Sequence, residues 1–97
     1  MRKCTKQIAA AFNAGKPRTV GNTHTDGTNV WLHGNLIIKR TPDGAILATL
    51  AGWNTPTTRE RVNGITGAGF HQKTRLPYLN GERCDSREWY TITPATP

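Results

Sequence analysis

The chain is 97 residues long, which is the size of one small domain. Thirteen lysines and arginines against six aspartates and glutamates give a net charge of +7, which favours a polyanionic partner such as nucleic acid, an anionic membrane or an acidic protein surface. No apolar run is long enough to span a membrane and the basic N-terminus lacks the apolar stretch of a signal peptide, so we expect neither.

The hydrophobic fraction is 35%, which is low for a globular chain and predicts a thin core. Such a core would depend on a few large side chains. The expected members are Phe12, Trp31, Trp53, Phe70, Tyr78, Trp89 and Tyr90.

The first helix is expected over residues 5–14. Thr5 suits the N-cap, and Gly15 suits the end of the helix. Ile8 and Phe12 lie one turn apart and predict the face that packs on the rest of the domain.

The Asp-Gly pair at 26–27 predicts a two-residue hairpin turn between strands at 20–25 and 28–33. In that register, His24 pairs with Asn29. Strand alternation places the aliphatic residues on one face with the threonines. The opposite face then carries His24, Trp31 and His33.

A second hairpin is expected from residues 36–40 and 45–50, because the Thr-Pro-Asp-Gly sequence at 41–44 is typical of a type I turn with a closing bulge. The Gly-Asn pair at 34–35 joins the two hairpins. It acts either as a tight turn or as a bulge within one bent strand.

A short second helix is expected over about residues 58–63, with Thr57 and Glu60 forming a capping box and Gly64 ending it. Further strands follow, with an Asn-Gly turn at 80–81. Their expected positions are about 70–73, 76–79, 83–84 and 89–93.

We therefore predict an α+β fold. Residues 1–93 form a single domain, in which an N-terminal helix and one short internal helix accompany an antiparallel sheet of about five to seven short strands. Residues 94–97 are expected to be a disordered tail.

The two cysteines, Cys4 and Cys84, belong to no CxxC pair or disulfide framework. Two free thiols in a reduced cytosol are the expected state, and a bridge between them stays an alternative. Cys84 precedes Asp85, and a histidine elsewhere could complete a thiol-type site, but nothing in the spacing favours this arrangement.

No pattern indicates catalysis, a metal or a cofactor. The three histidines lack the close spacing of zinc ligands. The glycine-rich stretch at 63–69 follows a helix and precedes a strand, which is the reverse of a phosphate-binding loop. We expect a protein that is not an enzyme and has no catalytic residues; an uncharacterised hydrolase is the less favoured alternative.

Nucleic-acid binding is the most concrete function that the composition suggests. Basic residues recur in pairs near turns, with aromatic residues between them, and a sheet with aromatic stacking surfaces and cationic edges suits single strands. The competing interpretation places these aromatic residues in the core. The candidate binding residues are Lys39, Arg40, Trp53, Arg59, Arg61, Lys73 and Arg75.

Three segments together resemble a family of small proteins encoded by tailed bacteriophages. They are Trp-Leu-His-Gly-Asn at 31–35, the Gly-Trp, Thr-x-Thr-Thr and Arg-x-Asn elements within 51–63, and Tyr-Leu-Asn-Gly at 78–81. The chain departs from the family pattern at Val62, where that pattern has Leu, and at 84–89, where it tends to Trp-Asp-Gly-x-Trp.

The resemblance implies a viral product made in the host bacterial cytoplasm, and it implies no activity or catalytic residues. Within the middle segment, Trp53 is expected to pack beneath the helix as part of the core; a cationic site of Arg59 and Arg61 beside it is the functional alternative. The favoured function is a phage accessory protein that binds nucleic acid. The alternative is a host-protein-binding inhibitor or adaptor acting on a bacterial enzyme or defence factor.

Overall fold

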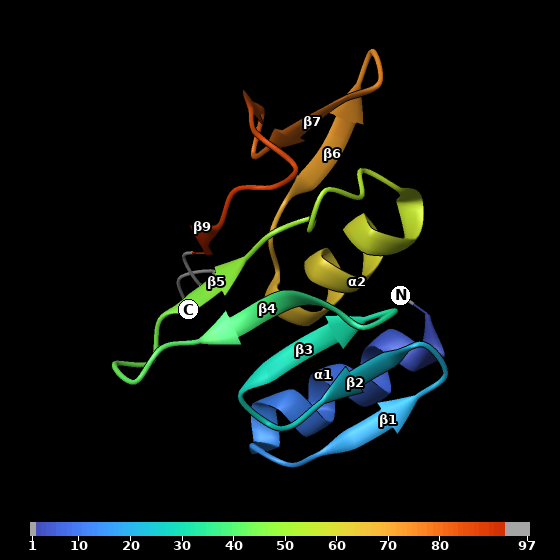
Figure 1. Ribbon diagram of the computed structural model, residues 1–97, viewed down its shortest axis with the longest axis vertical. Helices are drawn as coiled ribbons and strands as arrows, with labels where there is room; N and C mark the ends of the chain where they lie inside the picture. The colour runs from blue at the N-terminus through green and yellow to red at the C-terminus, as the bar shows by residue number, and fades with distance from the viewer. Residues whose placement is uncertain (1, 93–97) are drawn as a thin grey trace.

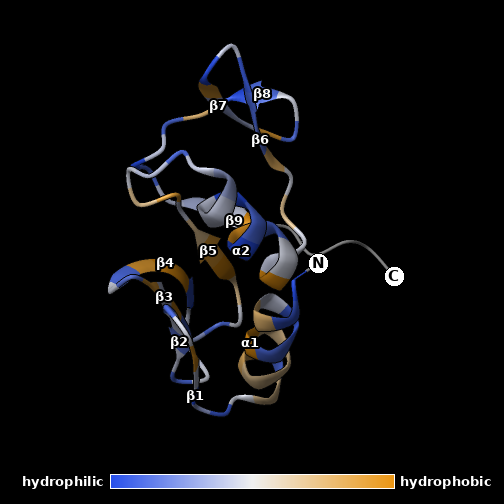
Figure 2. Cartoon of the chain, turned by 90° about the vertical axis from the view of Figure 1, so that its right-hand side faces the viewer, coloured by the Kyte–Doolittle hydropathy of each residue, from blue (hydrophilic) through white to orange (hydrophobic). Residues whose placement is uncertain are grey.

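A computed structural model describes residues 2–92 of the chain. Helix α1 (Lys3–Ala14) lies against one face of a six-stranded antiparallel sheet, and helix α2 (Pro56–Thr66) packs beside α1 (Figure 1; Figure 2). A smaller antiparallel sheet of three strands extends from the end of the molecule near α2. This architecture confirms the predicted α+β class, with its N-terminal helix and one internal helix.

Each sheet is built from short strands. The large sheet has the order β1-β2-β3-β4-β5-β9, so consecutive strands form hairpins up to β5, and the last strand returns to pair with β5. Its strands are β1 (Arg18–Val20), β2 (Thr23–Thr25), β3 (Asn29–Leu32), β4 (Asn35–Arg40), β5 (Ile46–Ala48) and β9 (Tyr90–Ile92). The small sheet, which we call the ribbon, consists of β6 (Phe70–Lys73), β7 (Leu76–Leu79) and β8 (Glu82–Arg83).

Helix α1 ends as predicted, because Gly15 adopts a left-handed conformation (φ 69°) and its N–H bonds the carbonyl of Phe12. Its start was predicted wrongly. The helix begins at Lys3 with no side-chain cap, and Thr5 is completely buried inside it. The Thr5 hydroxyl donates instead to Oε1 of Glu60, at 2.5 Å, so a tertiary partner takes the place of the local capping bond.

The hairpin register around the Asp-Gly pair was also predicted wrongly. His24 pairs with Trp31, two residues beyond the expected Asn29, and the loop between the two strands spans 26–28. The carboxylate of Asp26 causes this, because it accepts backbone N–H groups within the loop at 2.7 and 2.9 Å. A shift of two residues preserves the alternation, so the predicted division into two faces is correct for the paired residues of both strands. His33, which was expected beside Trp31, lies instead in the turn after β3.

Two turns lie where the sequence analysis did not place them. The expected strand over 20–25 is split into β1 and β2 by a turn at 21–22. The β3–β4 turn uses His33 and Gly34 (φ 50° and 80°), one residue earlier than the Gly-Asn pair, and both positive φ values fit a type I′ turn. The predicted turns at 41–44 and 80–81 are confirmed.

Helix α2 is longer than predicted at both ends. Its N-cap is Thr55, not Thr57, because the Thr55 hydroxyl oxygen accepts the N–H of Thr58 at 3.2 Å and Pro56 occupies the first turn. The helix continues beyond the glycine at position 64 and ends at Gly67, whose φ is 78°. The last strands differ by a residue or more from the expected 83–84 and 89–93, and the predicted tail at 94–97 lies outside the described residues.

The core is mostly aliphatic, and only two of the seven large aromatic residues expected there, Phe12 and Phe70, are buried in it. All three tryptophans lie outside it, and the side chain of Trp53 is 56% exposed. The buried cluster consists of Ile8, Phe12, Val30, Leu32, Ile37, Ile38, Ala48, Leu50, Val62, Ile65, Phe70, Cys84 and Ile92. Isoleucine, leucine and valine from the strands and helices therefore fill the space between α1, α2 and the sheet.

Cys4 and Cys84 are both free. The Cys4 thiol donates to the carbonyl oxygen of Val20 at 3.4 Å. Cys84 is buried, and this burial, together with the neighbouring Asp85 carboxylate, raises the pKa of its thiol.

Candidate nucleic-acid interface

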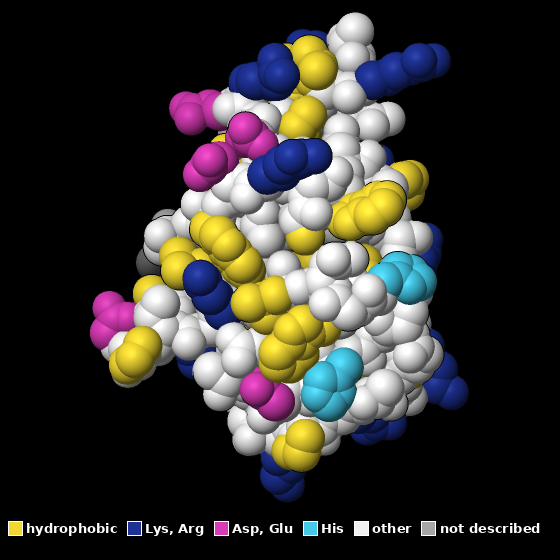
Figure 3. Space-filling view, viewed as in Figure 1, with side chains coloured by type: hydrophobic (Ala, Val, Ile, Leu, Met, Phe, Trp, Pro, Cys, Tyr) yellow, Lys and Arg dark blue, Asp and Glu magenta, His cyan; other side chains and the backbone are white. Residues whose placement is uncertain are grey.

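One face of the six-stranded sheet is covered by neither helix. Val30, Ile38 and Ala48 point toward α1 and are completely buried, so their strand neighbours Trp31, Lys39 and Leu47 point the other way. A β-bulge at Ile37 interrupts the alternation in β4, so Leu36, which pairs with Trp31, lies on the same side as Lys39. Figure 2 shows α1 beside this sheet, and Figure 3 views the molecule from the uncovered side, with hydrophobic side chains gathered over β4 and β5. We call this surface the open face. The strand residues on it are Thr19, His24, Asn29, Trp31, Leu36, Lys39, Leu47 and Thr91.

Aromatic rings occupy the open face and its border. The indole of Trp31 lies 5.5 Å from the His24 ring, centroid to centroid. The ammonium of Lys39 lies 4.2 Å from the centroid of Trp89, a cation–π contact. Trp53 and Trp89 line a shared hollow of about 490 Å³ together with Leu36. All three tryptophans of the chain therefore lie on or beside one surface.

The structure divides the predicted cationic residues between the two sides of the sheet. Lys39 is on the open face, but Arg40, the next residue, points inward by strand alternation. The Arg40 guanidinium lies 4.1 Å from the Phe12 ring centroid and donates to the carbonyl oxygens of Phe12 and Gly27. Arg40 therefore joins the sheet to the end of α1.

Arg61 is also turned inward, and it is only 5% exposed. Its guanidinium donates to the hydroxyl oxygens of Thr5 and Thr23, each at 3.0 Å, and to Oε1 of Glu60 at 2.5 Å. These bonds connect α2 to α1 and to β2. Because all of these contacts are internal, we exclude Arg61 from the interface.

Arg59 lies between α2 and the ribbon. Its guanidinium donates to Oδ1 of Asn54 at 2.5 Å and to Oε1 of Gln72 at 3.4 Å. The Asn54 amide in turn donates to the carbonyl oxygen of Arg75 at 3.5 Å, which connects the loop that carries Trp53 to the tip of the ribbon.

The remaining two predicted residues, Lys73 and Arg75, are exposed on the ribbon. The pairing of His71 with Tyr78 and of Tyr78 with Arg83 places these three side chains on one face, where the His71 and Tyr78 rings stack at 5.4 Å. Lys73 alternates onto the same face. The ribbon therefore offers a second aromatic and cationic surface.

Few carboxylates neutralise these cations. Among residues 2–92, the ion pairs all involve Glu60, with Arg2 at 3.9 Å and with Arg61 at 2.5 Å. Asp26 and Asp43 are engaged in turns, where backbone N–H groups lower the pKa of Asp26 and the Thr41 hydroxyl lowers that of Asp43. Apart from Arg2, the exposed lysines and arginines of the described chain are thus available to an anionic partner.

Several residues of the open face were missed as site residues. Trp31 and Trp89 were assigned to the core, and Arg87, which lines the hollow with Trp53 and Trp89, was not selected. The signal for Trp31 was present, because it alternates with buried aliphatic residues and shares its face with His24. Trp89 and Arg87 come from the loop before β9, and no sequence pattern predicts where that loop lies.

The segment at 51–63 has mainly structural roles. Thr55 caps α2, Arg61 joins the helices, and the Asn63 side chain both accepts from and donates to the backbone of Phe70, at 2.8 Å each. Trp53 is the exception. It was expected to be a buried core residue, and it is instead the most exposed large hydrophobic side chain of the described residues.

Other features of the described chain bear on the class of protein. No group of three or more histidine, cysteine, aspartate or glutamate side chains within residues 2–92 is arranged to hold a metal ion. None of the helices in that range has the length and apolar character needed to cross a membrane.

Comparisons with known proteins identify the family. A family model described as Kyanoviridae Gp96 protein matches residues 1–93, which is nearly the whole chain. No curated protein and no solved structure matches the chain significantly. The resemblance to small phage proteins is thereby confirmed, and the chain belongs to the Kyanoviridae Gp96 family of phage proteins.

Proposed function

We propose that this phage protein binds single-stranded nucleic acid on the open face of its six-stranded sheet. The observation that carries the proposal is the position of Trp31, Trp53 and Trp89, which lie on or beside the face that no helix covers. A binding role requires no catalytic group, and we propose this role instead of an enzymatic one.

Single strands suit this surface better than duplexes. Unpaired bases can stack on exposed indoles, and each stacked base contributes about 1–3 kcal/mol to binding. The bases of a duplex are already stacked on one another, and duplex recognition commonly inserts a helix or a two-stranded β-ribbon into the major groove. On the open face the indoles lie on a broad sheet surface, which matches the arrangement of single-strand binders.

Cations lie where a phosphate backbone would pass. Lys39 is on the open face itself, and Arg87 lines the hollow between Trp53 and Trp89. The ribbon adds Lys73 and Arg75, two further exposed charges. Each phosphate that these side chains neutralise adds to the salt dependence of binding.

Fluorescence anisotropy with labelled 12-mers of DNA and RNA tests the proposal, each compared with the matching duplex over a range of salt concentrations. We expect tighter binding of the single strands, with affinity that falls as salt rises. Trp31→Ala should weaken binding by about 5- to 150-fold, the range that the loss of one stacked base would produce. Absence of binding at low salt would overturn the proposal.

A matched control separates charge from stacking. Lys16→Ala removes an exposed cation near the end of α1, away from the tryptophans, and should leave single-strand affinity nearly unchanged, whereas Lys39→Ala should reduce both the affinity and its salt dependence. Equal effects of the two variants would show that net charge alone drives binding.

A bacterial host protein is the competing partner, because tryptophan and arginine also dominate protein interfaces. Capture from bacterial lysate with and without nuclease distinguishes the two, since a protein partner survives both nuclease and moderate salt. The proposed role places the protein in the host bacterial cytoplasm during infection, where single-stranded intermediates of replication and transcription occur.

A further inference from the structure

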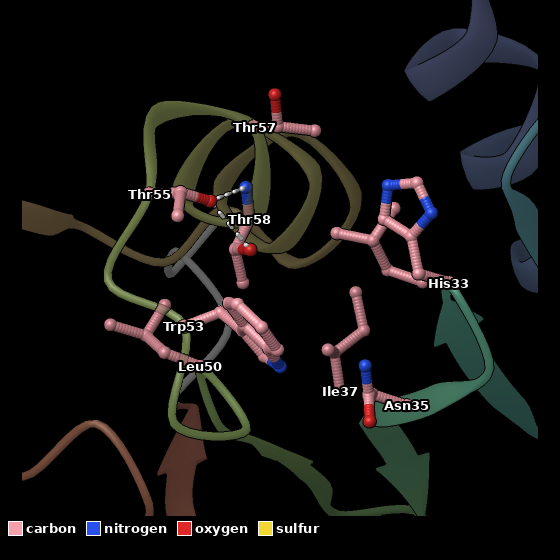
Figure 4. A pocket seen from close by; sticks show the side chains of 9 residues that line it. His33, Asn35, Ile37, Leu50, Trp53, Thr55, Thr57 and Thr58 are labelled. Atoms are coloured by element: carbon pink, nitrogen blue, oxygen red, sulfur yellow. Dashed lines mark hydrogen bonds between the residues drawn. The ribbon is translucent and has the colours of Figure 1, made fainter.

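A second hollow of about 380 Å³ adjoins the open face, and Trp53 lines both it and the hollow beside Trp89. Its apolar wall consists of Leu32, Ile37 and Leu50, all of them buried. Figure 4 shows the indole of Trp53 beside Ile37 and Leu50, with the start of α2 on one side and the β3–β4 turn on the other.

Polar groups with spare hydrogen-bonding capacity surround this hollow. The side-chain amide of Asn35 has no partner among the described residues. The side-chain amide nitrogen of Asn22 lies 3.0 Å from Nε2 of His33, which leaves Nδ1 of the ring to bond another group. The Thr57 hydroxyl oxygen accepts only a long 3.5 Å contact from Arg2 and keeps its own proton for another acceptor.

No lysine, arginine, aspartate or glutamate lines the hollow. Its chemistry therefore suits an uncharged ligand and not a phosphate. A flat ligand could stack on the indole, place its faces against the aliphatic wall, and direct a mixed donor and acceptor edge toward Asn35 and His33. A nucleobase has all of these properties, and the hollow lies within the size range of ligand pockets, about 300–1,000 Å³.

We propose that this pocket holds one base of the bound strand, stacked on Trp53 and recognised at its edge by Asn35 and His33. This inference rests on the proposed function and deepens it. Stacking on the open face accepts any base, because every base has an aromatic surface. Hydrogen bonds to one base edge discriminate between bases, so the pocket gives the protein a base preference.

The test compares 12-mers of dA, dC and dT by fluorescence anisotropy, using the full chain. We expect the wild type to prefer one of them by about fivefold or more, the low end of what a paired set of hydrogen bonds to a base provides. Asn35→Leu removes the amide at an exposed position and should reduce the preference to less than twofold, chiefly by weakening the binding of the preferred oligomer.

Asn13→Leu is the matched control. It makes the same substitution at an exposed position of α1, and it should leave the preference unchanged. Thermal unfolding of both variants close to that of the wild type excludes a general loss of structure. Equal binding of all three oligomers by the wild type, or a preference that survives in Asn35→Leu, would overturn the pocket assignment while the open face still binds. Failure of every oligomer to bind would instead overturn the proposed function.

Discussion

Arg61 offers the sharpest test of how the chain uses its positive charge. Arg61 is 5% exposed, and its guanidinium donates hydrogen bonds to Thr5, Thr23 and Glu60. Arg61→Met fills similar space but leaves these acceptors without their donor. Removing one partner of a buried ion pair commonly costs about 3–5 kcal/mol. The Glu60 side chain is 23% exposed, so water can replace part of the lost contact. We therefore expect Arg61→Met to lower the free energy of unfolding by about 3 kcal/mol, a large part of a small domain's stability.

Urea denaturation followed by circular dichroism measures this loss. Arg59→Met is the control, because Arg59 makes its hydrogen bonds near the surface and should cost less than about 1 kcal/mol. Under conditions where both variants are folded, neither should lose nucleic-acid affinity to the extent that Trp31→Ala does. The reasoning is refuted if Arg61→Met is as stable as Arg59→Met and instead abolishes binding, because Arg61 would then be a surface contact.

Three further predictions concern the fold. Gly27→Ala should lower the free energy of unfolding, measured by urea denaturation, by more than about 1 kcal/mol. The φ of Gly27 is 95°, and the added Cβ would lie 2.5 Å from the carbonyl carbon of Gly15. A variant as stable as the wild type would contradict this packing. NMR titration should place the pKa of Asp26 below 3.8. The carboxylate then stabilises the folded protein at pH values above 3.8, and this stabilisation is lost as the pH falls through the pKa of Asp26 in the folded state. An Asp26 pKa at or above 3.8 would argue against the loop geometry. The buried Cys84 thiol should react slowly with a thiol reagent at pH 7 and rapidly in denaturant, followed by mass spectrometry; fast modification of the native protein would show that the site is open.

Local sequence signals predicted much of the backbone. Gly15 ends α1, and the turns at 41–44 and 80–81 connect the expected strands, because these residues permit the backbone angles that the turns require. The separation of His24 and Trp31 from the buried threonines also followed from strand alternation. It was insensitive to the error in register because that error was an even number of residues.

The partners of buried polar residues could not be predicted in this way. Arg61 contacts Thr5 and Thr23, which lie 56 and 38 residues away in the chain. An arginine in a helix has the same local pattern whether it faces water or a buried acceptor, so it was included with the surface cations. Thr5 was assigned as a helix cap for the same reason, since its true partner Glu60 belongs to the other helix.

The amino-acid sequence by itself determined the α+β class, the turns at 41–44 and 80–81, the alternating faces of the strands and the likeness to a phage family. Only the tertiary structure decided which face meets water. Both helices pack on the same side, where aliphatic residues fill the core, and this leaves Trp31 and Trp89 on the other side. A tryptophan gains free energy by leaving water in a core or at an interface alike, so its presence in a sequence does not reveal which of the two it serves.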